Sequence, residues 1–417
     1  MLVDSSHQYP RHASRAVRDA LADTPVVVIQ GARQVGKSTL ATMLARGAED
    51  VISVTLDDPA TLAIAEADPV FFVEQAGRGL LVIDEAQRAP GLILPLKATV
   101  DRDRRPGRFL LTGSADLLQV KGVGDSLAGR AETIELMTLS QGELARREVP
   151  EDFVTWVVGG VEGRRFDALD PHAVVAGGYP EAIQRSPARA ARWFSSYVDR
   201  LADHDARELQ SGGYADHMRT LLSLVAAGGQ SELVKARLAR GMGVSENSVD
   251  AYVRLASTMR LLSLIPSWGR SSRGRIARRP KVGLSDAGLG SHLAGFTSAK
   301  AQTLGGREYY GALVEQFCAL ELARQRTWSA ESWELFHFRD HDGLEVEIVI
   351  ELADGRLIAV EVKSAEGVTE KAWRQLERFR ERFSDRVITG VVLHGGTQVA
   401  HLGGWLHVLP ITSLWQA

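Results

Sequence analysis

The feature that most constrains this chain is an apolar run, Val26 to Ile29, that leads directly into a G-x-x-x-x-G-K-S sequence. This spacing is typical of a loop that wraps phosphate groups between a buried strand and a helix. Its glycines allow backbone N–H groups to point at phosphate oxygens, and the following helix adds its positive N-terminal end. The motif predicts a nucleotide-binding α/β domain, with these residues at the phosphates: Gly31, Ala32, Arg33, Gln34, Val35, Gly36, Lys37, Ser38 and Thr39.

Two residues of this loop and two residues after a second strand have distinct predicted roles. Lys37 is expected to reach the outer phosphates, and the hydroxyl of Ser38 to ligate Mg²⁺. A second apolar strand, Leu80 to Ile83, ends in Asp84 and Glu85. We expect Asp84 to hold Mg²⁺, directly or through water, and Glu85 to polarise the water that attacks the γ-phosphate. ATP and Mg²⁺ are therefore the predicted cofactors.

A third strand and a later arginine extend this candidate site. The strand from Arg108 onwards ends in Thr112 and Ser114, which are candidates to contact the γ-phosphate, with a strand-end cap as the alternative. Arg130 is a candidate arginine finger that acts in a neighbouring subunit, because a guanidinium suits the charge on transferring phosphoryl oxygens. A surface ion pair is the alternative for Arg130.

Composition narrows the remaining classes of protein. A length of 417 residues allows roughly two to four domains. The formal net charge of -3 means that binding to nucleic acid requires a local basic patch. The single cysteine, Cys318, excludes an internal disulfide framework and a cysteine-based zinc site. No apolar segment reaches the length of a membrane span and no secretory signal is evident, so we expect a cytoplasmic protein without membrane contact.

The middle of the chain predicts a DNA-binding module. Three short amphipathic helices after residue 211 are followed by two strand-like segments, Leu261 to Ile265 and Val282 to Leu284, which is the order of a winged helix-turn-helix. A basic loop without acidic residues suits contacts to DNA phosphates without sequence-specific readout, and a protein-binding winged helix is the alternative. The basic residues between these strands are Arg270, Arg273, Arg275, Arg278, Arg279 and Lys281.

The last segment carries acidic residues in a pattern that suits metal-dependent chemistry. Glu315 lies in a helical pattern, Glu347 in a strand, and Glu361 and Lys363 two residues apart in the next strand. Side chains two apart on a strand face the same side. Carboxylates that converge with a lysine can bind Mg²⁺ and activate water for phosphodiester cleavage. A fold that binds DNA or protein without cutting is the alternative.

Together these motifs resemble the bacterial and archaeal AAA+ ATPases of the DUF4143-containing type. The resemblance implies an AAA_14-type P-loop domain (residues 1–138), a helical lid (139–210), a winged helix (211–295) and a domain similar to PD-(D/E)xK nucleases (296–417). It also implies a homo-oligomer, with a hexameric ring as one candidate. The matching segments are Gly31 to Thr39, Leu81 to Gln87, Leu111 to Ser114, Ser126 to Arg130, and Gly177 to Glu181.

The nuclease resemblance assigns its pattern to four residues, with one departure. Glu315 matches the helix carboxylate, and Glu361 with Lys363 the E-x-K pair. Glu347 stands where the pattern usually has aspartate. Its extra methylene displaces the carboxylate from the near-ideal geometry that Mg²⁺ demands, which puts cleavage in doubt.

The sequence thus predicts an α/β protein: a P-loop AAA+ parallel-sheet core with a helical lid, a winged helix-turn-helix and a nuclease-like α/β domain. The predicted function is Mg²⁺-dependent ATP hydrolysis coupled to binding and remodelling or translocation of DNA, branched DNA included. Two alternatives stay open. One is an ATP-regulated, metal-dependent DNA nuclease, and the other is an ATP-controlled, non-catalytic switch that binds a protein partner.

Overall fold

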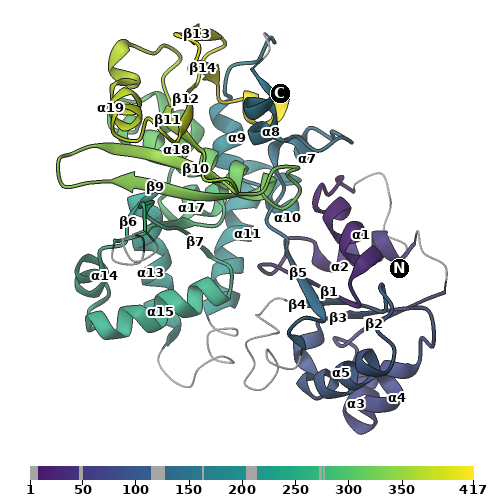
Figure 1. The fold of residues 1–417 in the computed structure, drawn as a ribbon. Coiled ribbons are helices and arrows are strands. Elements are labelled where there is room, and N and C mark those ends of the chain that lie inside the picture. Colours follow the sequence, from purple (N-terminus) through teal and green to yellow (C-terminus); the bar gives the residue numbers. More distant parts are fainter. Residues whose placement is uncertain are drawn as a thin grey trace. The chain divides into compact units, whose positions relative to one another are not determined.

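A computed structural model gives the structure of the protein in two compact units (Figure 1). Unit 1 comprises Met1–Leu139 and Thr258–Arg260, and unit 2 comprises Ser140–Ser257 and Leu261–Ala417. None of the described helices is both long enough and apolar enough to cross a membrane. The structure describes residues 8–46, 50–113, 127–161, 164–202, 214–271, 275 and 278–417.

Unit 1 is built on a five-stranded sheet with the order β2-β3-β4-β1-β5, in which every neighbouring pair runs parallel (Figure 1). The central strands β1 and β4 are buried along their whole length, as expected for parallel strands whose two faces are covered by helices. This arrangement confirms the predicted α/β fold class. The strands are β1 (Val26–Gln30), β2 (Val51–Thr55), β3 (Leu80–Asp84), β4 (Phe109–Gly113) and β5 (Ala131–Glu135).

Two of the helices in unit 1 begin at aspartate N-caps. Asp58 and Asp68 each accept a hydrogen bond from a backbone N–H of the first turn, at 2.9 Å in both cases, and proline follows each aspartate. Such caps satisfy donors that the helix itself leaves without a partner. The helical segments are α1 (Ala13–Asp23), α2 (Lys37–Ala45), α3 (Pro59–Ala67), α4 (Pro69–Glu74), η2 (Ala86–Arg88), η3 (Pro90–Leu92) and α5 (Ile93–Arg102).

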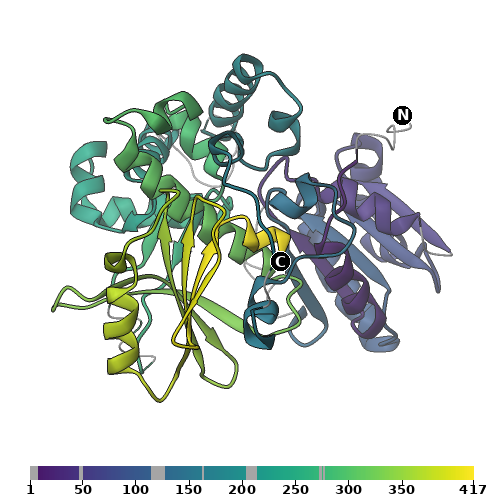
Figure 2. The ribbon, with the colours of Figure 1, turned by 90° about the horizontal axis from the view of Figure 1, so that it is seen from above.

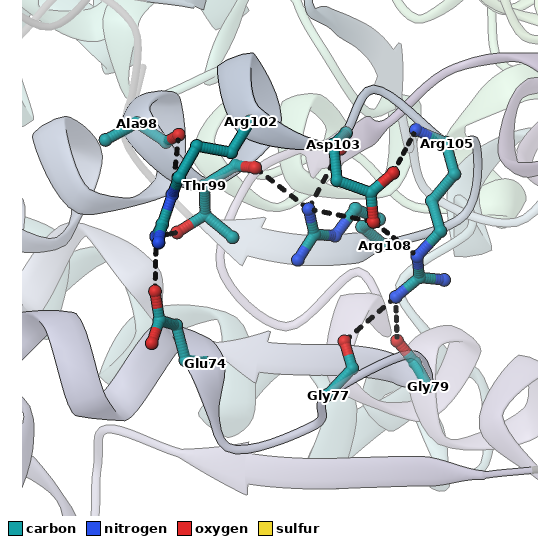
Figure 3. A network of polar contacts seen from close by, with 9 residues as sticks. All are labelled: Glu74, Gly77, Gly79, Ala98, Thr99, Arg102, Asp103, Arg105 and Arg108. Atoms are coloured by element: carbon teal, nitrogen blue, oxygen red, sulfur yellow. Dashed lines mark hydrogen bonds and ion pairs between the residues drawn. The ribbon is translucent and has the colours of Figure 1, made fainter.

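Two arginines, one buried and one half-buried, hold the end of this sheet at which β3 and β4 begin (Figure 3). Arg108 donates to the carbonyls of Thr99 and Asp103, both at 2.9 Å. Arg105 donates to the carbonyl of Gly77 at 3.0 Å, just ahead of β3. These bonds tie the end of α5 to the starts of β3 and β4, so they hold the sheet at the end opposite the carboxyl ends of its strands.

Unit 2 contains a six-stranded sheet with the order β13-β14-β12-β11-β10-β9. Strands β11, β12 and β14 run parallel to one another. Strand β10 pairs antiparallel with β11, β9 pairs antiparallel with β10, and β13 pairs antiparallel with β14. Side chains of β11 alternate between two cores: Ile358 and Val360 pack with helix α18 (Arg307–Gln325), whereas Leu357 and Ala359 pack with α19 (Arg374–Arg382). The two helices lie against this sheet in the ribbon views (Figures 1 and 2). The strands are β9 (Trp333–Arg339), β10 (Glu345–Leu352), β11 (Leu357–Lys363), β12 (Val387–His394), β13 (Ala400–Leu402) and β14 (Leu406–Pro410).

A small antiparallel sheet with the order β6-β8-β7 also belongs to unit 2. Its strands are β6 (Ser231–Glu232), β7 (Leu262–Ile265) and β8 (Lys281–Leu284), and three helices precede or alternate with them: α13 (Tyr214–Gly228), α14 (Lys235–Met242) and α15 (Glu246–Thr258). The remaining helical segments are α7 (Gln141–Leu144), α8 (Phe153–Gly159), α9 (Pro171–Ala176), α10 (Pro180–Ile183), α11 (Pro187–Arg200), α17 (Ala287–Leu293), η5 (Ser298–Gln302), α18 (Arg307–Gln325), η6 (Glu370–Ala372), α19 (Arg374–Arg382) and α20 (Ser413–Gln416).

The Gly-Gly-Tyr-Pro-Glu segment closes tightly on the start of α17. Gly177 has φ 69° and ψ -153°, and a Cβ there would lie 2.3 Å from Oδ1 of Asp286 and 2.6 Å from the amide nitrogen of Gly288. Asp286 is fully buried and accepts hydrogen bonds from the N–H groups of Gly178, at 2.8 Å, and Leu289, at 3.0 Å. This stretch therefore requires glycine for packing.

Replacing Gly177 by alanine should lower the free energy of unfolding of unit 2 by about 3 kcal/mol or more, because the backbone conformation and the space both require glycine. Gly243→Ala is the matched control. Gly243 has φ 68°, but a Cβ there meets no described atom within 4 Å, so we expect a loss of only about 1 kcal/mol. Urea unfolding measures both variants, and equal losses would contradict this account.

Helix α18 carries the buried carboxylate of Glu321, which contacts the first residues of unit 2. Glu321 accepts hydrogen bonds from Arg324 at 2.6 Å and from the N–H of Gln141 at 3.1 Å. Burial raises the pKa of Glu321 from 4.5 to about 7, although Arg324 opposes the shift. The folded-state pKa lies above the unfolded value, so the protonated carboxyl of Glu321 stabilises the folded protein. This contribution to the free energy of unfolding is complete below pH 4.5 and is lost as the pH rises towards 7.

Glu321→Gln should remove about 3 kcal/mol of this pH dependence, since each unit of pKa shift corresponds to about 1.4 kcal/mol. Urea unfolding at pH 5 and pH 8 would show the wild type losing more stability than the variant between the two conditions. Glu308→Gln, at an exposed position on the same helix, is the control that should behave as wild type. Identical pH dependence in wild type and Glu321→Gln would show that Glu321 ionises normally.

Candidate functional site

The phosphate-type loop joins the end of β1 to the start of α2, which begins at Lys37. Gln34 and Gly36 both adopt left-handed backbone conformations, with φ of 66° and 98°. Such residues curl the chain so that successive N–H groups point into a concavity suited to anions. A Cβ at Gly31 would lie 2.1 Å from the carbonyl oxygen of Leu136, so glycine is required where the loop passes the end of β5.

Lys37 lies inside this curl, with only 5% of the residue exposed. Its ammonium donates to the carbonyl oxygens of Gly31 at 3.1 Å and Ala32 at 3.0 Å. Burial lowers the pKa of Lys37, and the nearby carboxylates Glu85 and Asp84 offset only part of that effect. A phosphate would supply the negative charge that favours the ammonium form, because charge-assisted hydrogen bonds are stronger than those to neutral carbonyls.

Asp84, at the end of β3, lies among hydroxyl groups from three other elements. Ser38 of α2 donates to its Oδ1 at 2.8 Å, and the hydroxyl of Thr112 at the end of β4 donates to the same oxygen. Thr55, which ends β2, lies 3.5 Å from Oδ2. These groups meet because parallel strands bring their carboxyl ends to one edge. Hydroxyl and carboxylate oxygens are the ligands that Mg²⁺ prefers, so Ser38 and Asp84 fit the predicted ion.

Glu85 adopts an unusual backbone conformation beside this carboxylate. Its φ is 56°, in the left-handed region that non-glycine residues rarely adopt. Its N–H donates to the hydroxyl of Thr112 at 3.2 Å, and its carboxylate accepts a hydrogen bond from Gln87. Thr112 therefore links the Asp84 carboxylate to the Glu85 backbone, which is a positioning role that the sequence did not indicate. Strain of this kind gathers at functional sites.

Sequence reasoning missed residues that support the site. Arg11 is buried and donates to the carbonyls of Val35, at 2.6 Å, and Met137, at 2.7 Å, so it holds the loop against the segment that follows β5. Arg11 lies outside every motif, and no spacing rule connects it with the loop. The hydroxyl of Thr55 was detectable only as the last residue of a strand.

Arg130 lies at the opposite edge of the sheet from its own phosphate loop. It directly precedes β5, and its carbonyl accepts a hydrogen bond from the N–H of Val26 at the start of β1. The length of β1 therefore separates Arg130 from the loop, roughly 16 Å at the usual rise per residue. Its guanidinium donates to Asp101 at 2.6 Å and to the carbonyl of Ala128 at 3.1 Å. The surface ion pair is thus present, and any contact of Arg130 with nucleotide would be made in another chain.

Two of the predicted site residues, Ser114 and Arg273, lie outside the described residues.

The residues that directly follow β7 pack against the C-terminal sheet of unit 2. The ring of Trp268 is fully buried and contacts the rings of Phe338, Phe379 and Phe383. The backbone of Trp268 also joins β9 through a hydrogen bond to the carbonyl of His337 at 2.6 Å. The start of the expected wing is therefore part of the hydrophobic core.

The expected unpaired basic loop is wrong for three of its members. Arg270, although exposed, lies 3.8 Å from the carboxylate of Asp385. Arg275 forms an ion pair with Glu351 at 2.7 Å. Lys281 is buried and bonds to Glu315, so its charge is not available to DNA. Arg278 lies 5.6 Å from the ring centre of Phe338, but it remains exposed, as do Arg270 and Arg279.

The nuclease-like residues are brought together as a charged cluster. Lys363 donates to Glu361 at 2.5 Å, which confirms that they face the same side of β11, and it lies 3.6 Å from Glu347. Burial, followed by the charges of Glu361 and Glu315, raises the pKa of Glu347 well above its ordinary value. Within the described part of the chain, no group of three or more His, Cys, Asp or Glu side chains is arranged to hold a metal ion.

Comparisons with solved structures give only distant likenesses. A Walker-type ATPase of Pyrococcus abyssi covers 67% of this chain and 94% of its own length at 14% identity, with a TM-score of 0.43. AMPPCP-bound DnaA of Aquifex aeolicus covers 59% of this chain and 85% of its own at 14% identity and a TM-score of 0.26. A RuvB variant of Thermotoga maritima covers 61% and 87% at 18% identity and 0.29.

Two uncharacterized proteins, from Mycobacterium tuberculosis and Mycobacterium bovis, are each 28% identical over 356 residues, which is 85% of this chain and 73% of theirs. Residues 171–300 match the domain of unknown function DUF8612. The predicted resemblance is confirmed by two further matches, to the AAA domain AAA_14 and to the domain of unknown function DUF4143. The chain therefore carries an AAA_14-type P-loop ATPase domain over residues 23–145 and a DUF4143 domain over residues 310–414.

Proposed function

We propose that this protein hydrolyses ATP with Mg²⁺ and uses the hydrolysis to act on DNA. The observation that carries the ATPase part is the position of Asp84, whose carboxylate bonds to Ser38 of the loop and to Thr112 of β4. Lys37 would hold the outer phosphates, and Ser38 with Asp84 would hold Mg²⁺, which neutralises phosphate charge. Glu85, fixed through its N–H to Thr112, would orient the attacking water and accept its proton.

Lys37→Ala and Glu85→Gln should separate binding from chemistry. Lys37→Ala should lose both nucleotide binding and turnover, with turnover at least about 100-fold lower, because it removes the buried charge beside the phosphates. Glu85→Gln should bind ATP normally and reduce kcat by about 100-fold or more. Steady-state phosphate release and equilibrium ATP binding measure the two effects.

Lys371→Ala, which changes an exposed lysine on η6, is the control and should leave both measurements unchanged. Undiminished turnover in Lys37→Ala would contradict the proposed site.

Exposed arginines on two helices and one loop of unit 2 support the DNA part. Arg240 lies on α14, Arg254 on α15 and Arg279 shortly before β8. None of these side chains bonds to another described residue, so their charges are available to phosphates. Phosphate contacts of this kind position DNA without reading its sequence. The proposal therefore keeps a winged helix-turn-helix that binds DNA without sequence preference.

Changing Arg240, Arg254 and Arg279 to glutamine should weaken binding to DNA of any sequence. Each lost phosphate contact should reduce the slope of log affinity against log salt by about one. Arg275→Gln is the matched comparison and should leave the slope unchanged, because that guanidinium is already bonded to Glu351 and to the carbonyl of Gly269.

Fluorescence anisotropy on single-stranded, duplex, forked and four-way DNA, with ATP turnover on the same panel, measures the effect. DNA-independent turnover with unchanged binding in the triple variant would favour the protein-binding switch instead.

The position of Arg130 supports a homo-oligomer as part of the proposal. Arg130 lies beyond reach of the phosphate loop in its own chain. Its guanidinium suits the phosphoryl oxygens of a nucleotide that is bound by a neighbouring subunit. A ring, including a hexameric one, would present the start of β5 of one subunit to the loop of the next. A cytoplasmic location, where ATP is available, completes the proposal.

A further inference from the structure

The nuclease-like cluster of unit 2 contains a lysine that its sequence pattern does not include. The cluster is formed by the carboxylates of Glu315, Glu347 and Glu361 together with Lys363. Lys281 reaches it from β8, which lies in the small antiparallel sheet rather than in the six-stranded sheet. Its ammonium bonds to Glu315 and lies 3.7 Å from Glu345.

The backbone of Lys281 is fixed on both sides. β8 is the central strand of its sheet, and Lys281 pairs with Glu232 of β6 and with Ile265 of β7. Only 5% of its side chain is exposed. The ammonium is therefore delivered by a paired strand into a buried place, and it cannot leave without opening the sheet or exposing Glu315 unpaired.

The cluster already holds positive charge without a metal ion. Lys281 and Lys363 bring two positive charges to the carboxylates of Glu315, Glu347 and Glu361, which is the charge that one divalent cation would bring. A cation that bound Glu315 would have to approach the buried ammonium, and like charges repel strongly where water is excluded. The residues present therefore do not fit the Mg²⁺ site that the nuclease resemblance implies.

We propose that Lys281 is a built-in counter-ion that takes the place of the divalent cation in this domain. The carboxylates then serve as a structural anchor that pins the small sheet to the six-stranded sheet, and the domain does not cleave nucleic acid. Glu315 anchors β8 from helix α18, and Lys363 holds Glu347 and Glu361 together at the end of β11. The nuclease alternative loses its metal site.

The test is whether removing the ammonium creates a metal site. All chains carry Asp84→Asn, which removes the carboxylate expected to hold Mg²⁺ in unit 1, and no nucleotide is present. Lys281→Gln and Lys281→Met should gain at least about tenfold in Mn²⁺ affinity over the Lys281 parent, seen as a Tm that rises with Mn²⁺ and as loss of the free-ion signal in electron paramagnetic resonance. Lys281→Gln keeps a group that can bond to Glu315, so it protects against misfolding.

Two controls separate this effect from general surface charge. Lys235→Met removes the lysine of an exposed ion pair with Asp250 and should gain no Mn²⁺ affinity. Adding Glu315→Gln to either Lys281 variant should abolish the gain. The proposal is overturned if the Lys281 parent binds Mn²⁺ as tightly as the variants, or if the otherwise wild-type chain cleaves DNA with Mg²⁺ and loses cleavage in Lys363→Ala. Neither outcome depends on ATP hydrolysis, because Mn²⁺ binding and DNA cleavage are both measured without nucleotide.

Discussion

The carboxylate of Asp84 is the group on which the nucleotide site depends. It accepts bonds from the loop through Ser38 and from β4 through Thr112, and Thr112 in turn fixes the backbone of Glu85. These contacts require β3 and β4 to end at the same edge, which the parallel register and the arginines at the opposite edge secure. A shift of either strand would separate the acid from the loop.

Unit 2 shows a related arrangement, in which several charged groups of its interior have a partner. Asp286 caps α17 and accepts the N–H of Gly178, Glu351 pairs with Arg275 and Arg386, and Lys281 pairs with Glu315. Buried charges without such partners are strongly destabilising. The residues that resemble a nuclease site are therefore best understood together with the strand that supplies their counter-charge.

The sequence predicted most of unit 1, because strand–loop–helix spacing is local and Ser38, Asp84 and Thr112 each follow an apolar strand. It could not predict Arg11 or the ion pairs of Arg275 and Lys281, since these depend on contacts between residues distant in the chain. The basic run before β8 was interpreted from composition alone. Composition does not reveal that Trp268 is buried or that Glu315 lies within reach of Lys281.

We propose that Ser38 and Asp84 form a Mg²⁺-dependent ATP site, which calorimetric titration of ATP in the presence of Mg²⁺ or of a chelator tests directly. Mg²⁺ should tighten ATP binding to the wild type. Asp84→Asn should bind ATP with the same affinity in both conditions. An Asp84→Asn chain that keeps the full effect of Mg²⁺, or a wild type that binds no ATP in either condition, would contradict it.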